Sequence, residues 1–186
     1  FAEHEIQFIF CCDANFGIFP RDVDIARKAA EVKRRSGGFP RALSVQNAKN
    51  AEERIFQVHK ILFDAGLGTG VTLAFQSQDP EVLEAIEREN ISLEDFRTLQ
   101  RRFTEEGIDT YSDMIIALPK ETYDSFADGI SLTIEQGQHN RIQFGNLSMM
   151  PNAPMADPEY AKKYGLRTTE VRSVIFHGVI DATPDQ

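Results

Sequence analysis

The stretch that decides the fold is residues 71–90, VTLAFQSQDPEVLEAIEREN, in which an apolar run gives way abruptly to polar residues. Apolar side chains alternate through 71–75 and predict a buried strand. The amide, hydroxyl and carboxylate side chains of 76–79 follow, and Pro80 then opens a helical pattern whose apolar face lies within 82–86. The stretch therefore predicts one strand–helix unit with polar side chains at the carboxyl end of its strand.

The same order of strand, polar residues and helix recurs along the chain. Repeated units of this kind favour a parallel sheet, either doubly wound or closed as a (β/α) barrel, whose short apolar strands are buried on both faces. We expect one domain over residues 1–186, because no low-complexity linker separates the units. The predicted strands are 5–12, 41–46, 70–76, 110–118 and 141–150, and the predicted helices are 22–35, 51–66, a short one from 79–80, 92–107 and 121–137.

Capping residues mark several helix ends. Asp22 and Ser92 are predicted N-caps, and Asn50 with Glu53 has the spacing of a capping box. Gly66 is expected to end the second helix. The run GLGTG that begins there follows a helix and opens a strand, the reverse of a dinucleotide-binding loop, so we interpret it as a connector.

Composition excludes several classes of protein. The net charge of -9 disfavours broad electrostatic binding to nucleic acid or to an anionic membrane, and no apolar run approaches the roughly 20 residues of a membrane helix. The only cysteines, Cys11 and Cys12, are adjacent and cannot form a disulfide framework, which suits a reducing, cytoplasmic setting. The acidic charge favours a small molecule or peptide as substrate.

Polar residues gather where the predicted strands end. In both parallel architectures the carboxyl ends of the strands form the ligand-binding face, although strand ends also need polar caps for purely structural reasons. The sequence therefore predicts that a set of these side chains lines a site. The set comprises Asp13, Asn15, Gln46, Asn47, Gln76, Ser77, Pro119, Lys120, Glu121 and Ser148.

Two further charged residues, Arg88 and Asp113, are candidates for the predicted site. A helix packed behind its strand can return Arg88 to the strand end, where it could pair with a ligand carboxylate; alternatively it is a solvated arginine beside Glu84. Asp113 is the only acid in an otherwise apolar strand, and a buried carboxylate needs a partner, either from the protein or from a ligand.

No metal-binding pattern is evident. The four histidines are scattered without metal-ligand spacing, and adjacent strand residues point to opposite faces, so Cys11 and Cys12 are a poor clamp and are interpreted as buried small hydrophobic residues. We expect no metal site within this chain. The histidines are His4, His59, His139 and His177.

Four segments in order resemble motifs of the radical SAM superfamily, in particular of proteins associated with a cobalamin-binding domain. They cover roughly residues 5–166 and are similar to the second-, fourth-, fifth- and sixth-strand motifs of that group. The segments are FCCDANFGIFPRD (10–22), FQSQDPEVLEAIERENI (75–91), SDMIIALPKET (112–122) and LSMMPNAPMADPEY (147–160).

The resemblance implies a partial (β/α) TIM-like barrel, a radical SAM core that lacks its first strand–helix unit. It implies binding of S-adenosylmethionine (SAM), with Gln76 and Asp113 on the ribose, Arg88 on the methionyl carboxylate and Gln46 as a further polar contact. In the intact protein, a [4Fe–4S] cluster would generate a 5′-deoxyadenosyl radical for hydrogen abstraction, or support methyl transfer through cobalamin. Further expected residues are Ser77, Ile116 and Leu118 for SAM, and Asp13, Asn15, Asn47, Ser148 and Asn152 at the barrel mouth or substrate.

The sequence departs from the family pattern at three points. Ala117 stands where the family has a glycine, and Gln46, often a glutamate in related enzymes, cannot pair ionically with the SAM ammonium. The C-x3-C-x2-C loop that holds the cluster is absent, and Cys11 with Cys12 cannot supply its three thiolates. We therefore expect a fragment of a longer enzyme that is inactive alone and takes its cluster ligands from outside this chain.

Two other functions fit parts of the sequence. Lys120 could form a Schiff base in an aldolase-like barrel, although such lysines usually lie within a strand in a desolvated pocket. A degenerate barrel could instead bind a nucleoside or a partner without chemistry, in which case the natural gene would also lack the three cysteines.

Overall fold

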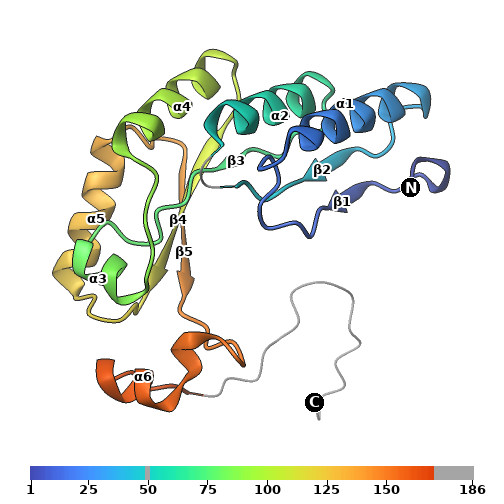
Figure 1. Cartoon of the computed structure of the whole chain (residues 1–186). Coiled ribbons are helices and arrows are strands. Elements are labelled where there is room, and N and C mark those ends of the chain that lie inside the picture. Colours follow the sequence, from blue (N-terminus) through green and yellow to red (C-terminus); the bar gives the residue numbers. More distant parts are fainter. Residues whose placement is uncertain (49–50, 170–186) are drawn as a thin grey trace, which may run out of the picture. The chain divides into compact units, whose positions relative to one another are not determined.

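The computed structural model describes residues 1–48 and 51–169, and the chain falls into two compact units, 1–147 and a second that begins at Ser148. The first unit contains η1 (Ala2–His4), β1 (Phe8–Phe10), α1 (Pro20–Arg35), β2 (Ala42–Ser44), α2 (Glu52–Asp64), β3 (Val71–Thr72), α3 (Pro80–Ala85), α4 (Leu93–Glu105), β4 (Thr110–Ile116), α5 (Tyr123–Glu135) and β5 (Arg141–Asn146) (Figure 1). The described part of the second contains η2 (Pro154–Ala156) and α6 (Pro158–Tyr164). The single domain over 1–186 stays a prediction.

All paired strands are parallel, as expected from the alternation of strands and helices. β1 pairs with β2, and β3, β4 and β5 form a second sheet in that order. A main-chain hydrogen bond from Leu43 N–H to the Leu67 carbonyl, 3.0 Å long, links β2 to the connector before β3. The α/β class with parallel strands is therefore confirmed.

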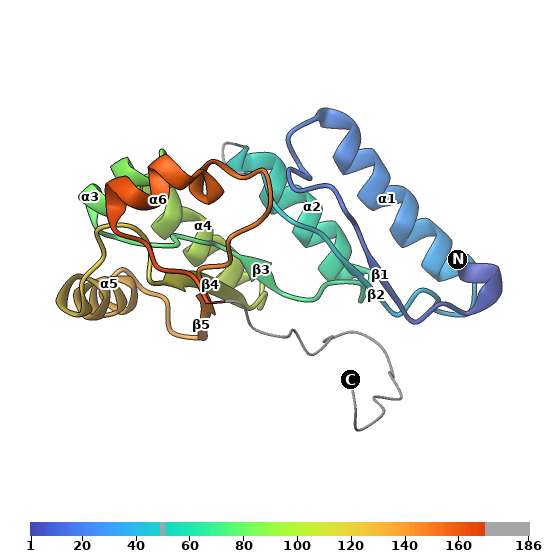
Figure 2. The ribbon, with the colours of Figure 1, turned by 90° about the horizontal axis from the view of Figure 1, so that it is seen from below.

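Helices α1, α2 and α4 lie along one side of the strands (Figures 1 and 2). Two clusters of buried apolar side chains fill the space beneath them. The α1–α2 core consists of Phe16, Val23, Ala26, Val58, Leu62 and Leu67. The α2–α4 core consists of Ala48, Ala51, Ile55, Val71, Leu73, Phe75, Phe96, Leu99, Phe103 and Ile108.

The prediction that the strands are buried on both faces is wrong. In β4 every second residue is buried against the helices, while Tyr111, Asp113 and Ile115 face the other side and are half-buried. Phe8 and Phe10 of β1 are 55% and 49% exposed. Side chains alternate between the two faces of a strand, and within the described residues helices cover only one of these faces.

The predicted helix ends at Ser92 and Gly66 are confirmed, and the structure adds Asp79 as an N-cap. Asp79 and Ser92 accept hydrogen bonds from the first turns of α3 and α4, and Gly66, at φ 65°, follows the last turn of α2. Asp22 is not the N-cap of α1, which begins earlier at Pro20; its carboxylate instead reaches back to main-chain N–H groups before the helix. The capping role of Asn50 lies outside the described residues.

The strands are shorter than predicted because their apolar runs continue past the last paired residue. Residues 5–12 predict a strand, but only Phe8–Phe10 form β1, and the predicted strand 70–76 reduces to Val71–Thr72 with a separate bridge between Gln76 and Met114. None of the described helices is long and apolar enough to span a membrane.

Candidate functional site

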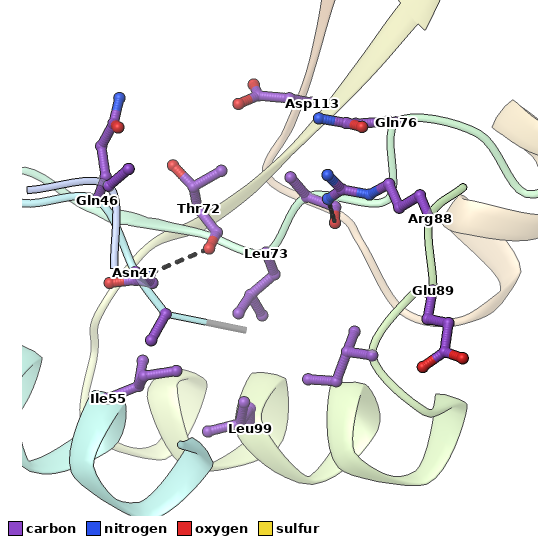
Figure 3. A pocket seen from close by; sticks show the side chains of 14 residues that line it. Gln46, Asn47, Ile55, Thr72, Leu73, Gln76, Arg88, Glu89, Leu99 and Asp113 are labelled. Carbon is purple, nitrogen blue, oxygen red and sulfur yellow. Dashed lines mark hydrogen bonds between the residues drawn. The ribbon is translucent and has the colours of Figure 1, made fainter. Parts of the chain in front are cut away.

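A cavity of about 400 Å³ lies at the carboxyl ends of β2, β3 and β4 (Figure 3). Its lining is polar around the strand ends and apolar towards α2 and α4. Five residues predicted from the sequence meet here: Gln46, Asn47, Gln76, Arg88 and Asp113. The remaining lining residues are Ala14, Ala48, Ile55, Thr72, Leu73, Ala74, Glu89, Ile91 and Leu99.

The main chain at Gln76 adopts an unusual conformation. Its φ of 65° lies in the left-handed region, which residues other than glycine rarely occupy. Two main-chain hydrogen bonds of 2.9 Å hold it there, one from its N–H to the Asp113 carbonyl and one from Ile115 N–H to its own carbonyl. Pairing with β4 thus holds Gln76 in this strained conformation. Figure 3 shows the Gln76 amide beside Asp113.

Arg88 lies beyond the end of α3, so the expectation that it is part of a helix is wrong. Its Nη2 donates to the Ala74 carbonyl at 3.3 Å, while its Nε is buried without a hydrogen-bond partner. Within the described chain it has no carboxylate at ion-pair distance, so pairing with Glu84 is wrong, and burial lowers the pKa of its guanidinium. A half-buried cation with an unpartnered N–H group is suited to an anionic ligand.

Asp113 points away from the helices and into the cavity. Its Oδ1 accepts a hydrogen bond of 3.1 Å from the Gln143 amide on β5. Burial raises the pKa of its carboxyl group, and the nearby Arg141 and the Gln143 hydrogen bond oppose that rise. The predicted need for a partner is thus met in part by the protein, and the other carboxylate oxygen is available to a ligand.

The buried His59 pairs with the partly buried Asn47, a contact that was not predicted from the sequence. The Asn47 Oδ1 lies 2.5 Å from Nε2 of His59, and its Nδ2 donates to the Thr72 carbonyl at 3.1 Å. Burial lowers the pKa of His59 to about 4. The only sequence signal was a lone histidine on the otherwise apolar face of a predicted helix. The apolar lining residues Ile55, Leu73 and Leu99 were equally hidden, since in sequence they are ordinary core positions.

Several predicted site residues do not line the cavity. Ser77 is buried and donates to a Glu121 carboxylate oxygen at 3.1 Å, and Leu118 is also buried, whereas Ile116 is partly exposed. Asp13 and Asn15, on either side of Ala14, are exposed, and the main-chain N–H of Asn15 donates a hydrogen bond to Oδ1 of Asp13. Ser148 and Asn152 belong to the second unit.

The lysine and cysteine side chains considered for Schiff-base or metal chemistry do not form such sites in the described residues. Lys120 is exposed, with its Nζ 3.6 Å from the Glu81 carboxylate, so it lacks the desolvated pocket that a Schiff base needs. Cys11 is partly buried against the α1–α2 core and Cys12 is exposed, so the interpretation of both as buried holds in part for Cys11 and is wrong for Cys12. Among the described residues, no three His, Cys, Asp or Glu side chains converge to hold a metal ion.

No protein-family profile matches the chain. It is 46% identical over 175 residues to the cobalamin-dependent radical SAM methyltransferase TokK of Streptomyces tokunonensis, covering 94% of this chain and 26% of TokK. It is 47% identical over 172 residues to 2-(S-pantetheinyl)-carbapenam-3-carboxylate methyltransferase of Streptantibioticus cattleyicolor, covering 92% of this chain and 25% of that enzyme. The chain thus spans about a quarter of the length of the curated relatives it matches.

Solved structures of other proteins contain a similar fold. The radical SAM methyltransferase TsrM of Kitasatospora setae, solved with cobalamin and a [4Fe–4S] cluster, superposes with a TM-score of 0.64 at 20% identity, over 90% of this chain and 31% of TsrM. TsrM solved with tryptophan and a SAM analogue gives a TM-score of 0.57 at 18% identity, over 77% of this chain and 28% of TsrM. The resemblance to the radical SAM superfamily is therefore confirmed: the chain is homologous to about a quarter of a cobalamin-dependent radical SAM methyltransferase.

Proposed function

We propose that this chain is the SAM-binding part of a cobalamin-dependent radical SAM methyltransferase, folded as a partial (β/α) barrel without its first strand–helix unit. The observation that carries the proposal is the convergence of Gln46, Gln76, Arg88 and Asp113 on one cavity, with Nε of Arg88 buried and unpartnered. Three strand–helix units contribute these side chains: Gln46 follows β2, Gln76 and Arg88 belong to the β3–α3 unit, and Asp113 lies on β4. The identity to TokK supports the same assignment.

Each of these side chains suits one part of SAM. The guanidinium of Arg88 matches the methionyl carboxylate, which would accept from its free Nε–H group. The Asp113 carboxylate and the Gln76 amide can bind the two ribose hydroxyls, as acceptor and as donor or acceptor. Gln46, exposed at the cavity edge, would hydrogen-bond the remaining polar groups. The exposed part of Ile116 would contact the adenine, while Ser77 and Leu118 are buried outside the cavity lining and are not proposed to touch SAM.

The cluster does not fit this chain. It needs three thiolates, whereas the sequence has two cysteines and one of these packs into the α1–α2 core. We propose that the cluster ligands, and the cobalamin site, lie in parts of the protein outside these 186 residues. When bound, the cluster, SAM and cobalamin supply the radical and methyl-carrier chemistry. The residues described here hold SAM in a fixed orientation and exclude water from it.

The methyl acceptor is proposed to be a small molecule, and the protein to act in the cytoplasm. The Streptantibioticus relative is named for a carbapenam-3-carboxylate, and TsrM was solved with its substrate tryptophan; both are small molecules. The acidic charge of the chain gives no broad surface for nucleic acid.

Arg88→Ala in the full-length protein tests the proposal. Equilibrium dialysis should show that SAM affinity falls about 10- to 100-fold, because a charge-assisted hydrogen bond is lost. Arg97→Ala, an exposed arginine on α4, is the matched control and should bind SAM as the wild type does. Asp113→Asn should weaken binding about tenfold without loss of stability, since a desolvated charge is removed.

Two results would overturn the proposal: a wild-type protein that binds no SAM, or an Arg88→Ala variant that binds it normally. A protein that binds SAM but whose gene encodes no cluster cysteines would instead favour the degenerate nucleoside-binding barrel. Sequencing the gene on both sides of this segment decides between an enzyme and that alternative.

A further inference from the structure

The polar residues of the candidate site come from two separate sheets. Gln46 follows β2, whereas Gln76, Arg88 and Asp113 belong to the β3–β5 half. One side of Gln46 is fixed by main-chain bonds to the β1 side, from Phe16 N–H to the Gln46 carbonyl at 2.9 Å and from Ala48 N–H to the Phe16 carbonyl at 3.0 Å.

Beside the apolar packing of Ala48 with Val71 and Leu73 in the α2–α4 core, a side-chain hydrogen bond links the halves at the cavity. Nδ2 of Asn47 donates to the Thr72 carbonyl across the gap between the sheets, as Figure 3 shows. The main-chain link to Leu67 comes from Leu43, the middle residue of β2, and neither residue lines the cavity. In the described residues, the carboxyl end of β2 is therefore tied to β3 through the Asn47 amide.

His59 determines how that amide is oriented. The Thr72 carbonyl can only accept, so the amide nitrogen of Asn47 must face it and the amide oxygen must face His59. His59 must then carry its proton on Nε2. His59 is 5% exposed and its ring packs edge-on against Phe103, with ring centroids 6.0 Å apart, so the ring has little freedom to turn. Burial also keeps the imidazole neutral at physiological pH.

We propose that His59 is a positioning residue for SAM binding: through Asn47 it sets the distance between Gln46 and the Gln76–Arg88–Asp113 group. The inference rests on the proposed function. His59 itself does not line the cavity, so its effect on a ligand must pass through Asn47. Without the Nε2 donor, the Asn47 amide can turn, the bond to Thr72 is weakened and the cavity loses its fixed width.

The test compares His59→Met with His59→Gln in the full-length protein. Both replacements are unbranched helix formers of similar length, but only Gln places an N–H donor near the position of Nε2. We expect the Kd for SAM to rise about fivefold in the Met variant and to stay within twofold of wild type in the Gln variant. The KM for SAM should follow the Kd, while kcat at saturating SAM stays unchanged.

Controls separate positioning from stability. Val58→Ala, the preceding residue on α2, packs in the α1–α2 core and should lower the melting temperature without changing the Kd. If His59→Met does not fold, His59→Asn, polar but too short to reach Asn47, replaces it. Equal Kd values for the donor-free and Gln variants overturn the inference, as does a Val58→Ala variant that loses the same affinity. A wild type that binds no SAM overturns the proposed function and this inference together.

Discussion

The two sheets of the first unit differ in how completely they are built. β4 pairs with β5 from Tyr111 to Ile116, and its helix-facing residues are buried, whereas β1 pairs with β2 only over Phe8–Phe10 and exposes both phenylalanines. Most of the candidate site lies on the better-formed β3–β5 half, and the β1–β2 half contributes Gln46 and Asn47. Similar apolar runs are thus buried in one sheet and exposed in the other, because the residues that cover a strand lie far away in the chain.

The largest expected difference between the halves is in core packing. Phe96→Ala removes a fully buried ring that stacks against Phe75 at 4.5 Å in the α2–α4 core, and should lower the free energy of unfolding by about 3–5 kcal/mol. Phe8→Ala on β1 should cost less than about 1 kcal/mol, since more than half of its ring surface is already in water. Urea unfolding compares the two. An equal cost would mean that β1 is covered in solution.

The link between the halves should respond to pH. Burial lowers the pKa of His59 from 6.5 to about 4, so the unfolded chain binds the proton more tightly than the folded protein does. Stability from this group is complete above pH 6.5 and is lost as the pH falls towards 4, by up to about 3 kcal/mol. The difference in unfolding free energy between wild type and His59→Gln, measured from pH 4 to 7.5, isolates it. A difference that does not change with pH would contradict the assignment.

Capping in the β1–β2 half gives a smaller effect. The buried carboxylate of Asp22 accepts from Gly17 N–H at 2.9 Å and from Phe19 N–H at 3.0 Å, so Asp22→Ala leaves two main-chain donors unpaired. We expect a loss of about 2 kcal/mol in unfolding free energy. Asp24→Ala, which removes an exposed acid from the same helix, should change stability by less than about 0.5 kcal/mol. Thermal unfolding of both variants is the measurement, and similar melting temperatures would refute the role of Asp22.

The smallest effect concerns Ala117, directly after β4. Its φ of 68° is costly for a residue with a side chain, by about 1 kcal/mol, which accounts for the glycine expected there from the family motif. Ala117→Gly relieves this strain and adds a similar entropic cost, so stability should change by less than about 0.5 kcal/mol. Ala30→Gly within α1 should lose about 1 kcal/mol in the same assay. Equal losses would mean that residue 117 is not strained.

Some features of the fold and the site could be predicted because they depend on neighbouring residues. The order of strand and helix within 71–90, the Ser92 cap and the Gly66 helix end are all local, and the structure confirms them. The rule that parallel strands gather their carboxyl ends correctly placed Gln46, Asn47 and Gln76 at one cavity, whereas Asp113 was predicted as the acid within its strand. Their roles towards SAM remain predictions.

Other features were decided only in three dimensions. Which strand faces are covered, the turn that brings Arg88 to the Ala74 carbonyl, and the hydrogen bonds from His59 through Asn47 to Thr72 all join residues a dozen or more positions apart. Such contacts follow from how helices pack on the sheet, and no sequence period records them. The sequence by itself determined the order of strands and helices and the family; the tertiary structure decided which side chains meet, because burial and hydrogen-bond geometry depend on the whole packed unit.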